Sequence, residues 1–553
     1  MQASPARVIE YFNGEKQNLI PLFQRSYTWE KKDWQALWED LMVQYESPDN
    51  STHFMGAVVS LPAKSVPVGV SKYLIIDGQQ RLSTISILLC ALRDSLDETS
   101  ASRVQEVYLT NRYRAPEDLL KLVPTQSDRN SYRALVIERD TSTFTGRIVE
   151  AYKFFLNMIV CATDTNDQHL SCERLLTTIE HNLQVVMINL DEADDPYLIF
   201  ESLNAKGEPL TQADLVRNYV LMRFRHSISA GGEQEKIYTK YWLPLEQMLG
   251  ANLSEFLRHE AMKAGENVKE GGIYTAVKAT LKDEASVGVE ELLVVMRDAG
   301  RHYQKLVEPA QETEPSIRKR LTALRDLKIK VSYPLILRFF ESHQKEVLST
   351  PDLESCLGLV ESLSIRRAVC GVPTNGLNKM FLQWCKNYPD DNQLDWFMNT
   401  LSGGAGGSRF PTDAEFSEQL ESQSQYGKAS TSFILRQIEL SFQHLEPVLL
   451  DGLTIEHVMP QTLTNDWKVM LGSEWQKIHD RYVHTIGNLT LTGYNPELGN
   501  LSLRDKKAIF ATAHVELSRF ILEQSTWTEV EICARAKALS ARAITIWKSS
   551  NAA

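Results

Sequence analysis

The chain has 553 residues, of which 43% are hydrophobic and 24% charged, an ordinary composition for a globular protein. A single hydrophobic core does not organise a chain of this length, so we expect two or three domains. The formal net charge of −12 does not suggest a protein that coats DNA with its whole surface. This net charge does not exclude DNA binding, because phosphate contacts need only a local basic face.

Cysteine usage and hydropathy indicate the compartment. The seven Cys residues are scattered, with no CxxC pair and no Cys/His cluster. This argues against a zinc site or a disulfide framework and favours reduced, cytoplasmic thiols. No apolar run reaches the roughly 18 residues of a membrane-spanning helix. Residues 1–16 contain no apolar h-region, so we expect no secretory signal and no membrane partner.

A polar pair precedes a Trp-rich stretch near the N-terminus. Trp29, Trp34 and Trp38 recur at helical spacing, which predicts a helix packed into the core. Gln24 and Arg25 lie just before them, between aromatic neighbours. A polar pair held in this way can face a pocket, and Arg suits bidentate binding of a phosphate.

The sequence DGQQR at residues 77–81 joins a predicted strand at residues 73–76 to a predicted buried helix at residues 82–96. Gly78 lets the backbone approach a ligand closely, and the free N–H groups that begin the helix suit an anion. Arg81 adds a positive charge, and Asp77 is a candidate for a metal or a ribose. On spacing alone, a tight turn with a solvated Arg is the simpler interpretation.

The next segments continue the αβ pattern. Residues 185–190 predict a buried strand, and residues 194–204 predict a helix. Thr211 and Asp214 resemble a capping box with Asp at its third position, and they open a helix that we expect to reach residue 225.

Residues 233–401 show almost only helical periodicity and predict a helical middle domain. Within it, Arg366 and Arg367 are predicted to face either a nucleotide or a neighbouring domain. The glycine-rich residues 403–409 that follow predict a flexible segment.

Near the C-terminus, alternation predicts a strand at residues 453–458 and a second strand at residues 489–492. A polar loop with two Trp residues separates them. A turn rich in Asn, Pro and Gly follows at residues 494–500, and Ser502 begins a helix.

This strand–loop–strand–helix carries the residue types that phosphodiester hydrolysis requires. The reaction needs a base to activate water and positive charge to neutralise the phosphate. His457 can supply the base. Glu456, Asn495 and Asn500 offer oxygen ligands for Mg²⁺ or Mn²⁺. The alternative interpretation is an ordinary strand pair followed by turn-forming Asn residues.

The sequences EHVMP, IGNLTLT and YNPELGN in this region resemble the His-Me finger (HNH-type) nucleases. The resemblance implies a ββα nuclease fold with His457 as general base and Glu456 and Asn495 as ligands on the metal side. It also implies that Asn488 holds the loop that orients His457. Many HNH enzymes carry His where this chain has Asn495, which can bind a metal but cannot act as a second base.

Three further residues belong to this candidate site. His484 is a spare candidate base for which a structural role is the favoured interpretation. Lys506 and Lys507 are candidate DNA contacts, although such a basic pair is more often a solvated helix face.

The sequence FQRSYTW at residues 23–29, taken with DGQQR, is similar to the N-terminal domain of GmrSD-type restriction endonucleases, as are residues 199–221. Residues 364–381 also resemble this family. The resemblance implies a ParB/sulfiredoxin-like domain that binds or hydrolyses nucleotides. By position, its nucleotide pocket would be lined by Gln24, Arg25, Asp77, Gly78, Gln79, Gln80 and Arg81. Further candidates for this pocket are Glu201, Asn204, Lys206, Asp214 and Asn218. Helix capping explains Asp214 at least as well, and loop geometry is an alternative explanation of Asn204.

These features predict an α+β multidomain protein that is mostly helical. Residues 1–230 would form the ParB-like nucleotide-binding or sensor domain, and residues 231–402 the helical middle domain. Residues 403–412 would be a flexible linker. Residues 413–553 would form the HNH-like nuclease domain, with its ββα element embedded in helices.

The resemblance implies a modification-dependent (type IV) restriction enzyme of prokaryotic anti-phage defence. We expect a metal-dependent endonuclease that cuts modified double-stranded phage DNA under NTP control, and double-strand cutting would suit a homodimer. Two other classes of function stay open as alternatives. An NTP-binding defence switch or scaffold with an inactive nuclease would fail to nick DNA with a metal. An RNA-cleaving abortive-infection effector would prefer RNA, although the sequence lacks an RNP1-type aromatic motif.

Overall fold

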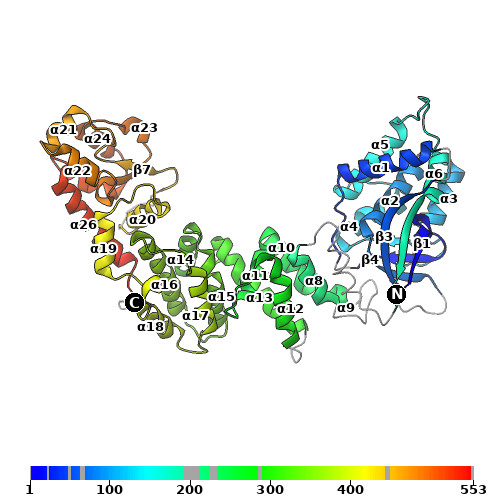
Figure 1. The fold of residues 1–553 in the computed structure, drawn as a ribbon, viewed down its shortest axis with the longest axis horizontal. Coiled ribbons are helices and arrows are strands. Elements are labelled where there is room, and N and C mark those ends of the chain that lie inside the picture. Colours follow the sequence, from blue (N-terminus) through cyan, green and yellow to red (C-terminus); the bar gives the residue numbers. More distant parts are fainter. Residues whose placement is uncertain are drawn as a thin grey trace. The chain divides into compact units, whose positions relative to one another are not determined.

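The computed structural model describes residues 2–21, 24–47, 51–62, 69–191, 211–222, 233–283, 289–442 and 449–549. The chain forms two compact units, drawn with their elements labelled in Figure 1. The first comprises Met1–Gln247 and Tyr274–Val294, and the second comprises Met248–Ile273 and Val295–Ala553. None of the described helices is long and apolar enough to cross a membrane.

The first unit is built on a mixed six-stranded sheet with the order β1-β6-β3-β4-β2-β5. β1 and β6 are antiparallel, as are β3 and β4, whereas β6 with β3, β4 with β2 and β2 with β5 are parallel. The strands are β1 (Gln2–Arg7), β2 (Lys16–Leu19), β3 (His53–Pro62), β4 (Ser71–Asp77), β5 (Leu122–Val123) and β6 (Leu183–Asn189).

Six of the described helices share one apolar core with the sheet: α1 (Lys31–Glu46), α2 (Gln79–Arg93), α3 (Glu98–Val104), α4 (Gln126–Arg133), α5 (Arg147–Cys161) and α6 (Cys172–Asn182). α8 (Gln212–Met222) and α9 (Glu233–Ile237) also belong to this unit, and α10 (Leu243–Leu249) includes residues of both units. α2 is buried on almost every face, as its apolar sequence predicts, and α1 buries Trp34 and Trp38. The predicted helix at residues 194–204 lies outside the described residues.

Gly78 forms the turn between β4 and α2. Its φ of 88° lies in the left-handed region that favours Gly. A Cβ atom at this position would also lie 2.8 Å from Cγ2 of Val58. The strand–turn–helix predicted from DGQQR is therefore present, and its tight turn requires Gly on both conformational and steric grounds.

The second unit is mostly helical. Its helices up to the glycine-rich segment are α11 (Leu253–Met262), α14 (Pro315–Asp326), α15 (Tyr333–Gln344), α16 (Thr350–Val369), α17 (Leu377–Lys386) and α18 (Gln393–Ser402). α12 (Ile273–Asp283) and α13 (Val289–Val307) include residues of both units. This region confirms the predicted helical character of residues 233–401.

The glycine-rich segment lies within the second unit and is held in place by two buried Arg side chains. Arg367 donates from Nη1 to the carbonyl oxygen of Gly407 over 2.7 Å, and Arg366 donates from Nη1 to that of Pro411 over 3.0 Å. Arg366 also pairs with Asp413 over 2.5 Å. Arg366 also donates from Nη2 to the carbonyl oxygen of Trp547 over 2.6 Å. Asp413 and Trp547 both lie in residues 413–553, the predicted nuclease domain, so Arg366 makes the expected contact with a neighbouring predicted domain. Arg367 holds the glycine-rich loop.

The C-terminal part of this unit contains the two strands predicted for the candidate nuclease. α19 (Asp413–Ser422) and α20 (Ala429–Leu440) precede β7 (Thr454–His457), which pairs antiparallel with β8 (Leu489–Thr492). The later elements are α23 (Asn495–Leu498), α24 (Leu503–Phe510), α25 (Arg519–Glu523) and α26 (Glu529–Ile546). Ser502 caps α24 by accepting the N–H of Asp505, so the predicted start of this helix is confirmed.

The connection between β7 and β8 is more ordered than predicted. The polar loop expected there contains α21 (Asn465–Leu471) and α22 (Trp475–Tyr482). α21 buries Trp467 and Leu471, which are four residues apart and therefore lie on one face of the helix. Burial of this face explains why a segment with polar composition is helical.

Candidate active site

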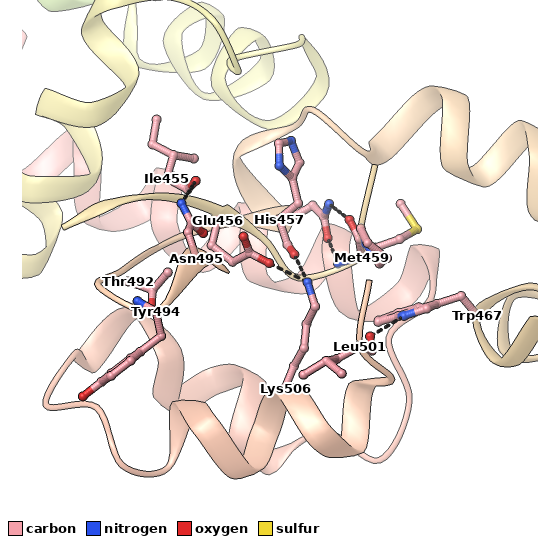
Figure 2. A network of polar contacts seen from close by, with 12 residues as sticks. Ile455, Glu456, His457, Met459, Trp467, Thr492, Tyr494, Asn495, Leu501 and Lys506 are labelled. Carbon is pink, nitrogen blue, oxygen red and sulfur yellow. Dashed lines mark hydrogen bonds and ion pairs between the residues drawn. The ribbon is translucent and has the colours of Figure 1, made fainter. Parts of the chain in front are cut away.

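The β7–β8 hairpin places the predicted catalytic residues on two faces. Glu456 lies opposite Thr490, and His457 lies opposite Leu489. Successive side chains of a strand point to opposite sides. Figure 2 shows the His457 ring on one side of β7 and the Glu456 carboxylate on the other. The two neighbours in sequence therefore meet different surroundings.

Lys506 of α24 occupies the Glu456 side of the strand. Its Nζ atom is 2.5 Å from Oε1 of Glu456 and 2.7 Å from the carbonyl oxygen of His457. The Lys506 side chain is fully buried. Burial raises the pKa of Glu456 and lowers the pKa of Lys506, and the ion pair opposes both shifts. This corrects the prediction that Lys506 contacts DNA, because a buried ammonium bonded in this way is not a surface ligand for phosphate.

Asn495 lies on the same side of β7 as the Glu456 carboxylate (Figure 2). Its Nδ2 atom donates to the carbonyl oxygen of Ile455 over 3.0 Å and to Oγ1 of Thr454 over 2.6 Å. Because the Ile455 carbonyl can only accept, this contact fixes which end of the amide is nitrogen. The opposite atom, Oδ1, is buried and has no hydrogen-bond partner.

An unpartnered, buried carbonyl oxygen near a carboxylate fits a bound cation. Mg²⁺ binds through few protein oxygens and keeps several waters. Glu456 and Asn495 are suited to hold such an ion, which would share the carboxylate with the ammonium of Lys506. Among the described residues, no group of three or more His, Cys, Asp or Glu is placed to hold a metal. A site here therefore depends on amide oxygen and water as well as carboxylate.

The remaining metal and DNA candidates lie around α23 and α24. Asn500 is exposed in the turn between these helices, and its side chain makes no hydrogen bond to any residue that the structure describes. Lys507 is half-buried and donates from Nζ to the carbonyl oxygen of Gln524 over 2.6 Å. Neither residue is joined to Glu456 or Asn495 by a direct bond.

On the other side of β7, His457 belongs to a cluster of three rings. Its Nε2 atom is 3.1 Å from Nδ1 of His484. The Tyr426 ring stacks on His484 and meets His457 edge-on, with centroids 5.3 Å and 4.4 Å away. Burial lowers the pKa of His457 to about 4, with smaller contributions from the nearby His484, Lys506 and His479. At neutral pH the imidazole of His457 is uncharged.

Asn488 holds the turn that follows His457. Its Oδ1 atom accepts from the backbone N–H of Met459 over 2.8 Å and from Nε1 of Trp527 over 3.0 Å. Its Nδ2 atom donates to the carbonyl oxygens of Met459 and Val483, each over 2.9 Å. The fully buried amide thus connects both sides of the turn. The HNH resemblance implies that Asn488 holds the loop that orients His457, and that role in the site stays a prediction.

Several residues of the site carry no local signal in the sequence. Tyr426 precedes α20, Trp527 precedes α26, and Arg535 lies within α26. Arg535 is buried and donates from Nη1 to the carbonyl oxygens of Gly487 and Leu489. Each of these residues is distant in sequence from the EHVMP segment, so only the fold brings them to it.

In the first unit, the two segments predicted to form a nucleotide pocket lie together. Gln24 donates from Nε2 to the carbonyl oxygen of Ile76 over 2.8 Å. Gln80 accepts the N–H of Thr28 over 2.9 Å and donates to the carbonyl oxygen of Ser26 over 3.0 Å. The amides of Gln24 and Gln80 therefore join the FQRSYTW segment to the end of β4 and the start of α2.

The charged members of the predicted pocket surround the same turn. Arg81 donates from Nη1 to the carbonyl oxygen of Ala57 over 2.8 Å. Burial raises the pKa of Asp77, whereas the N–H of Gly78 and the charges of Arg81 and Arg25 act in the opposite direction. Gln79 is buried at the first position of α2. The carboxylate of Asp77 thus lies close to two guanidinium groups.

A cavity of about 320 Å³ opens beside Gln24 within the first unit. It is lined by Gln24, Ser26, Thr125, Gln126, Ser127, Arg217, Tyr238, Leu243, Glu246 and Gln247. The N–H of Asp214 donates to Oγ1 of Thr211 over 3.1 Å, and the N–H of Thr211 donates to the Asp214 carboxylate over 3.3 Å, so the predicted capping box is confirmed.

Two groups of pocket candidates remain. Asn218 is fully buried, and neither atom of its amide has a hydrogen-bond partner. Glu201, Asn204 and Lys206 lie outside the described residues.

Comparison with known protein families gives matches at both ends of the chain. Residues 8–221 match the N-terminal domain of the GmrSD restriction endonuclease, and residues 410–542 match the C-terminal domain of GmrSD restriction endonucleases. The first match includes both predicted pocket segments, and the second includes Tyr426, His457, Asn488 and Asn495. A comparison with curated proteins gives no match. The chain belongs to the GmrSD-type restriction endonuclease family.

Proposed function

We propose that the protein is a DNA endonuclease of prokaryotic phage defence that cuts modified foreign DNA at a His-Me finger (HNH-type) site. The observation that carries the proposal is the arrangement around β7. A neutral His457 ends the strand on a turn held by Asn488, and Glu456 and Asn495 lie on the other side of β7. The match of residues 410–542 to a restriction endonuclease domain supports the same assignment.

In this proposal His457 acts as the general base. Nδ1 of His457 accepts a proton from water, the water oxygen attacks the phosphorus, and the bond to the leaving oxygen breaks. The leaving oxygen then takes a proton from solvent. A bound Mg²⁺ or Mn²⁺, held by Glu456 and Asn495, would neutralise charge on the phosphate. The phosphate would contact both sides of β7 at the end of the strand, where His457 is the last residue.

The test is cleavage of modified and unmodified phage DNA with Mg²⁺, alongside the His457→Ala variant. Loss of the general base is expected to lower the cleavage rate by about 10²–10⁴-fold. Rates of His457→Ala equal to those of the wild type would remove His457 from the mechanism. Equal cutting of both DNAs by the wild type would keep the nuclease and remove the sensing of modification. Preference for RNA would replace the DNA substrate.

We further propose that the first unit binds a nucleoside triphosphate at the DGQQR turn and that binding regulates the nuclease. Free N–H groups at the start of α2 and the guanidinium groups of Arg25 and Arg81 suit phosphate. The test is calorimetric titration of each NTP into wild type, Arg81→Ala and Arg112→Ala. Arg112 is an exposed residue of the same unit that pairs with Glu106, and serves as the matched control. Weaker binding only in Arg81→Ala is expected, and unchanged affinity would exclude Arg81 from the pocket.

A further inference from the structure

His484 is fixed from two sides by the segment that precedes α20. Its carbonyl oxygen accepts the N–H of Gln425 over 2.8 Å and the N–H of Tyr426 over 3.3 Å. The Tyr426 ring is nearly parallel to the His484 ring, with an interplanar angle of 10°. Gln425 is itself fully buried. Both the backbone and the ring of His484 are therefore held in one position next to His457.

The contact between the two imidazoles sets a chemical constraint. A hydrogen bond between two neutral imidazoles requires a protonated nitrogen on one ring and a lone pair on the other. Nε2 of His457 and Nδ1 of His484 are 3.1 Å apart. If Nε2 of His457 donates, its Nδ1 atom carries the lone pair. If Nδ1 of His484 donates instead, His457 carries its proton on Nδ1 and cannot accept another there.

The other basic side chains near His457 do not bond to its ring. The ammonium of Lys506 bonds to Glu456 and to the backbone carbonyl of His457, on the other side of β7. His479 bonds through Nε2 to the carbonyl oxygen of Pro460 over 3.0 Å. Among the residues that the structure describes, His484 is the side chain that hydrogen-bonds to the imidazole of His457.

We propose that His484 is a positioning residue for the nuclease. It accepts the Nε2 proton of His457, holds the ring in one orientation and selects the tautomer whose Nδ1 lone pair takes a proton from water. Tyr426 supports this geometry by stacking on His484. The inference rests on the proposed function, in which His457 is the general base, and adds the group that orients the base.

The test combines DNA cleavage kinetics with a spectroscopic measure of the tautomer. The variants are His484→Ala, His484→Gln and His514→Ala, where His514 is an exposed His of the same unit and serves as the matched control. His484→Ala is expected to lower kcat by about 10–100-fold, by analogy with the loss of groups that orient metal-ligating His residues. KM should change little. The Gln side chain retains an acceptor, so His484→Gln should recover part of kcat, and His514→Ala should match the wild type.

Nitrogen NMR of the full chain labelled at His provides a readout that does not depend on activity. His457, assigned by its loss in His457→Ala, is expected to carry its proton on Nε2 in the wild type and to show a tautomer mixture in His484→Ala. Circular dichroism and urea unfolding check that each variant is folded. A wild-type proton on Nδ1 would overturn the inference whether or not the protein cuts DNA.

The kinetic outcomes separate this inference from the proposed function. An inactive His457→Ala with fully active His484→Ala would overturn only the role of His484. An active His457→Ala would overturn the general base itself. A rise in KM with unchanged kcat in His484→Ala would assign His484 to DNA binding and would also overturn the positioning role.

Discussion

Lys506 gives the candidate site a buried positive charge that is balanced by Glu456. The Glu456 side chain is only 11% exposed and the Lys506 side chain is fully buried. Removal of one partner from such a pair leaves an uncompensated charge away from water, whereas removal of both leaves an apolar contact. The pair therefore stabilises the hairpin against α24 only while both members are present.

Lys506→Met is expected to lower the free energy of unfolding of the second unit by about 3–5 kcal/mol. The matched control is Lys507→Met, because Lys507 is half-buried and bonds to a backbone carbonyl rather than to a carboxylate. Urea unfolding measures both variants. The double variant Lys506→Met with Glu456→Leu should recover much of the loss. Equal stability of Lys506→Met and wild type would contradict the importance of the buried charge.

His259 makes the stability of the second unit depend on pH. Its side chain is 4% exposed, and burial lowers its pKa from 6.5 to about 4. Because the folded-state pKa is the lower one, the unfolded chain binds more protons between these values. This contribution to stability is complete above pH 6.5 and is lost as the pH falls toward 4.

Between about pH 7 and about pH 4.5, His259 should account for a loss of about 2–3 kcal/mol in the free energy of unfolding. Denaturant unfolding at both values, with His259→Gln for comparison, measures this. The variant should lose less stability on acidification than the wild type does. Parallel losses in the two proteins would assign the pH dependence to other groups, such as His457, whose pKa is also lowered by burial.

The contact between α26 and the turn before β8 (Ile486–Asn488) positions the Asn488 amide, which bonds to Met459 and Val483. At Gly487 a Cβ atom would lie 2.2 Å from the carbonyl oxygen of Ile532, so the two backbones meet without an intervening side chain. Arg535, one turn further along α26, donates to the carbonyl oxygens of Gly487 and Leu489. α26 thus fixes the segment from which Asn488 reaches the turn after His457.

Gly487→Ala is expected to destabilise the second unit and to lower DNA cleavage, because one of the two backbones must move. Gly493→Ala is the matched control, since its Cβ atom would meet only Cδ2 of Leu453 at 3.7 Å. Thermal unfolding and a cleavage assay compare the two variants. The idea fails if both Ala variants unfold at the wild-type temperature.

At the scale of the whole molecule, the chain contains separate hydrophobic cores. Leu88 belongs to the core of the first unit. Ile434, Ile365 and Leu489 share a core in the second unit, although the predicted linker at residues 403–412 falls between them in sequence. Packing therefore joins the predicted middle and nuclease domains in one unit. The boundary between the two compact units falls instead within residues 247–295.

Separate cores predict more than one unfolding transition. Leu88→Ala and Ile434→Ala each remove a fully buried side chain and should cost about 2–5 kcal/mol locally. Calorimetry of the full chain should show that Leu88→Ala lowers one transition and Ile434→Ala lowers another. A single transition shifted equally by both variants would show that the units unfold together.

The sequence by itself determined features that depend on neighbouring residues. Alternation predicted β8, the DGQQR motif predicted the turn between β4 and α2, and the capping residues Thr211 and Ser502 predicted where two helices begin. Helical periodicity likewise predicted the largely helical residues 233–401. These signals are local, because capping, turn geometry and periodicity involve residues a few positions apart.

Only the tertiary structure decided features that depend on distant contacts. β1 was not predicted, because it is an exposed edge strand that contains Pro5 and shows no apolar alternation. The ion pair of Lys506 and the stacking of Tyr426 on His484 join separate segments. Burial of a charge or a ring depends on which segments the fold brings together. The spacing of residues within one segment does not determine which other segments will pack against it.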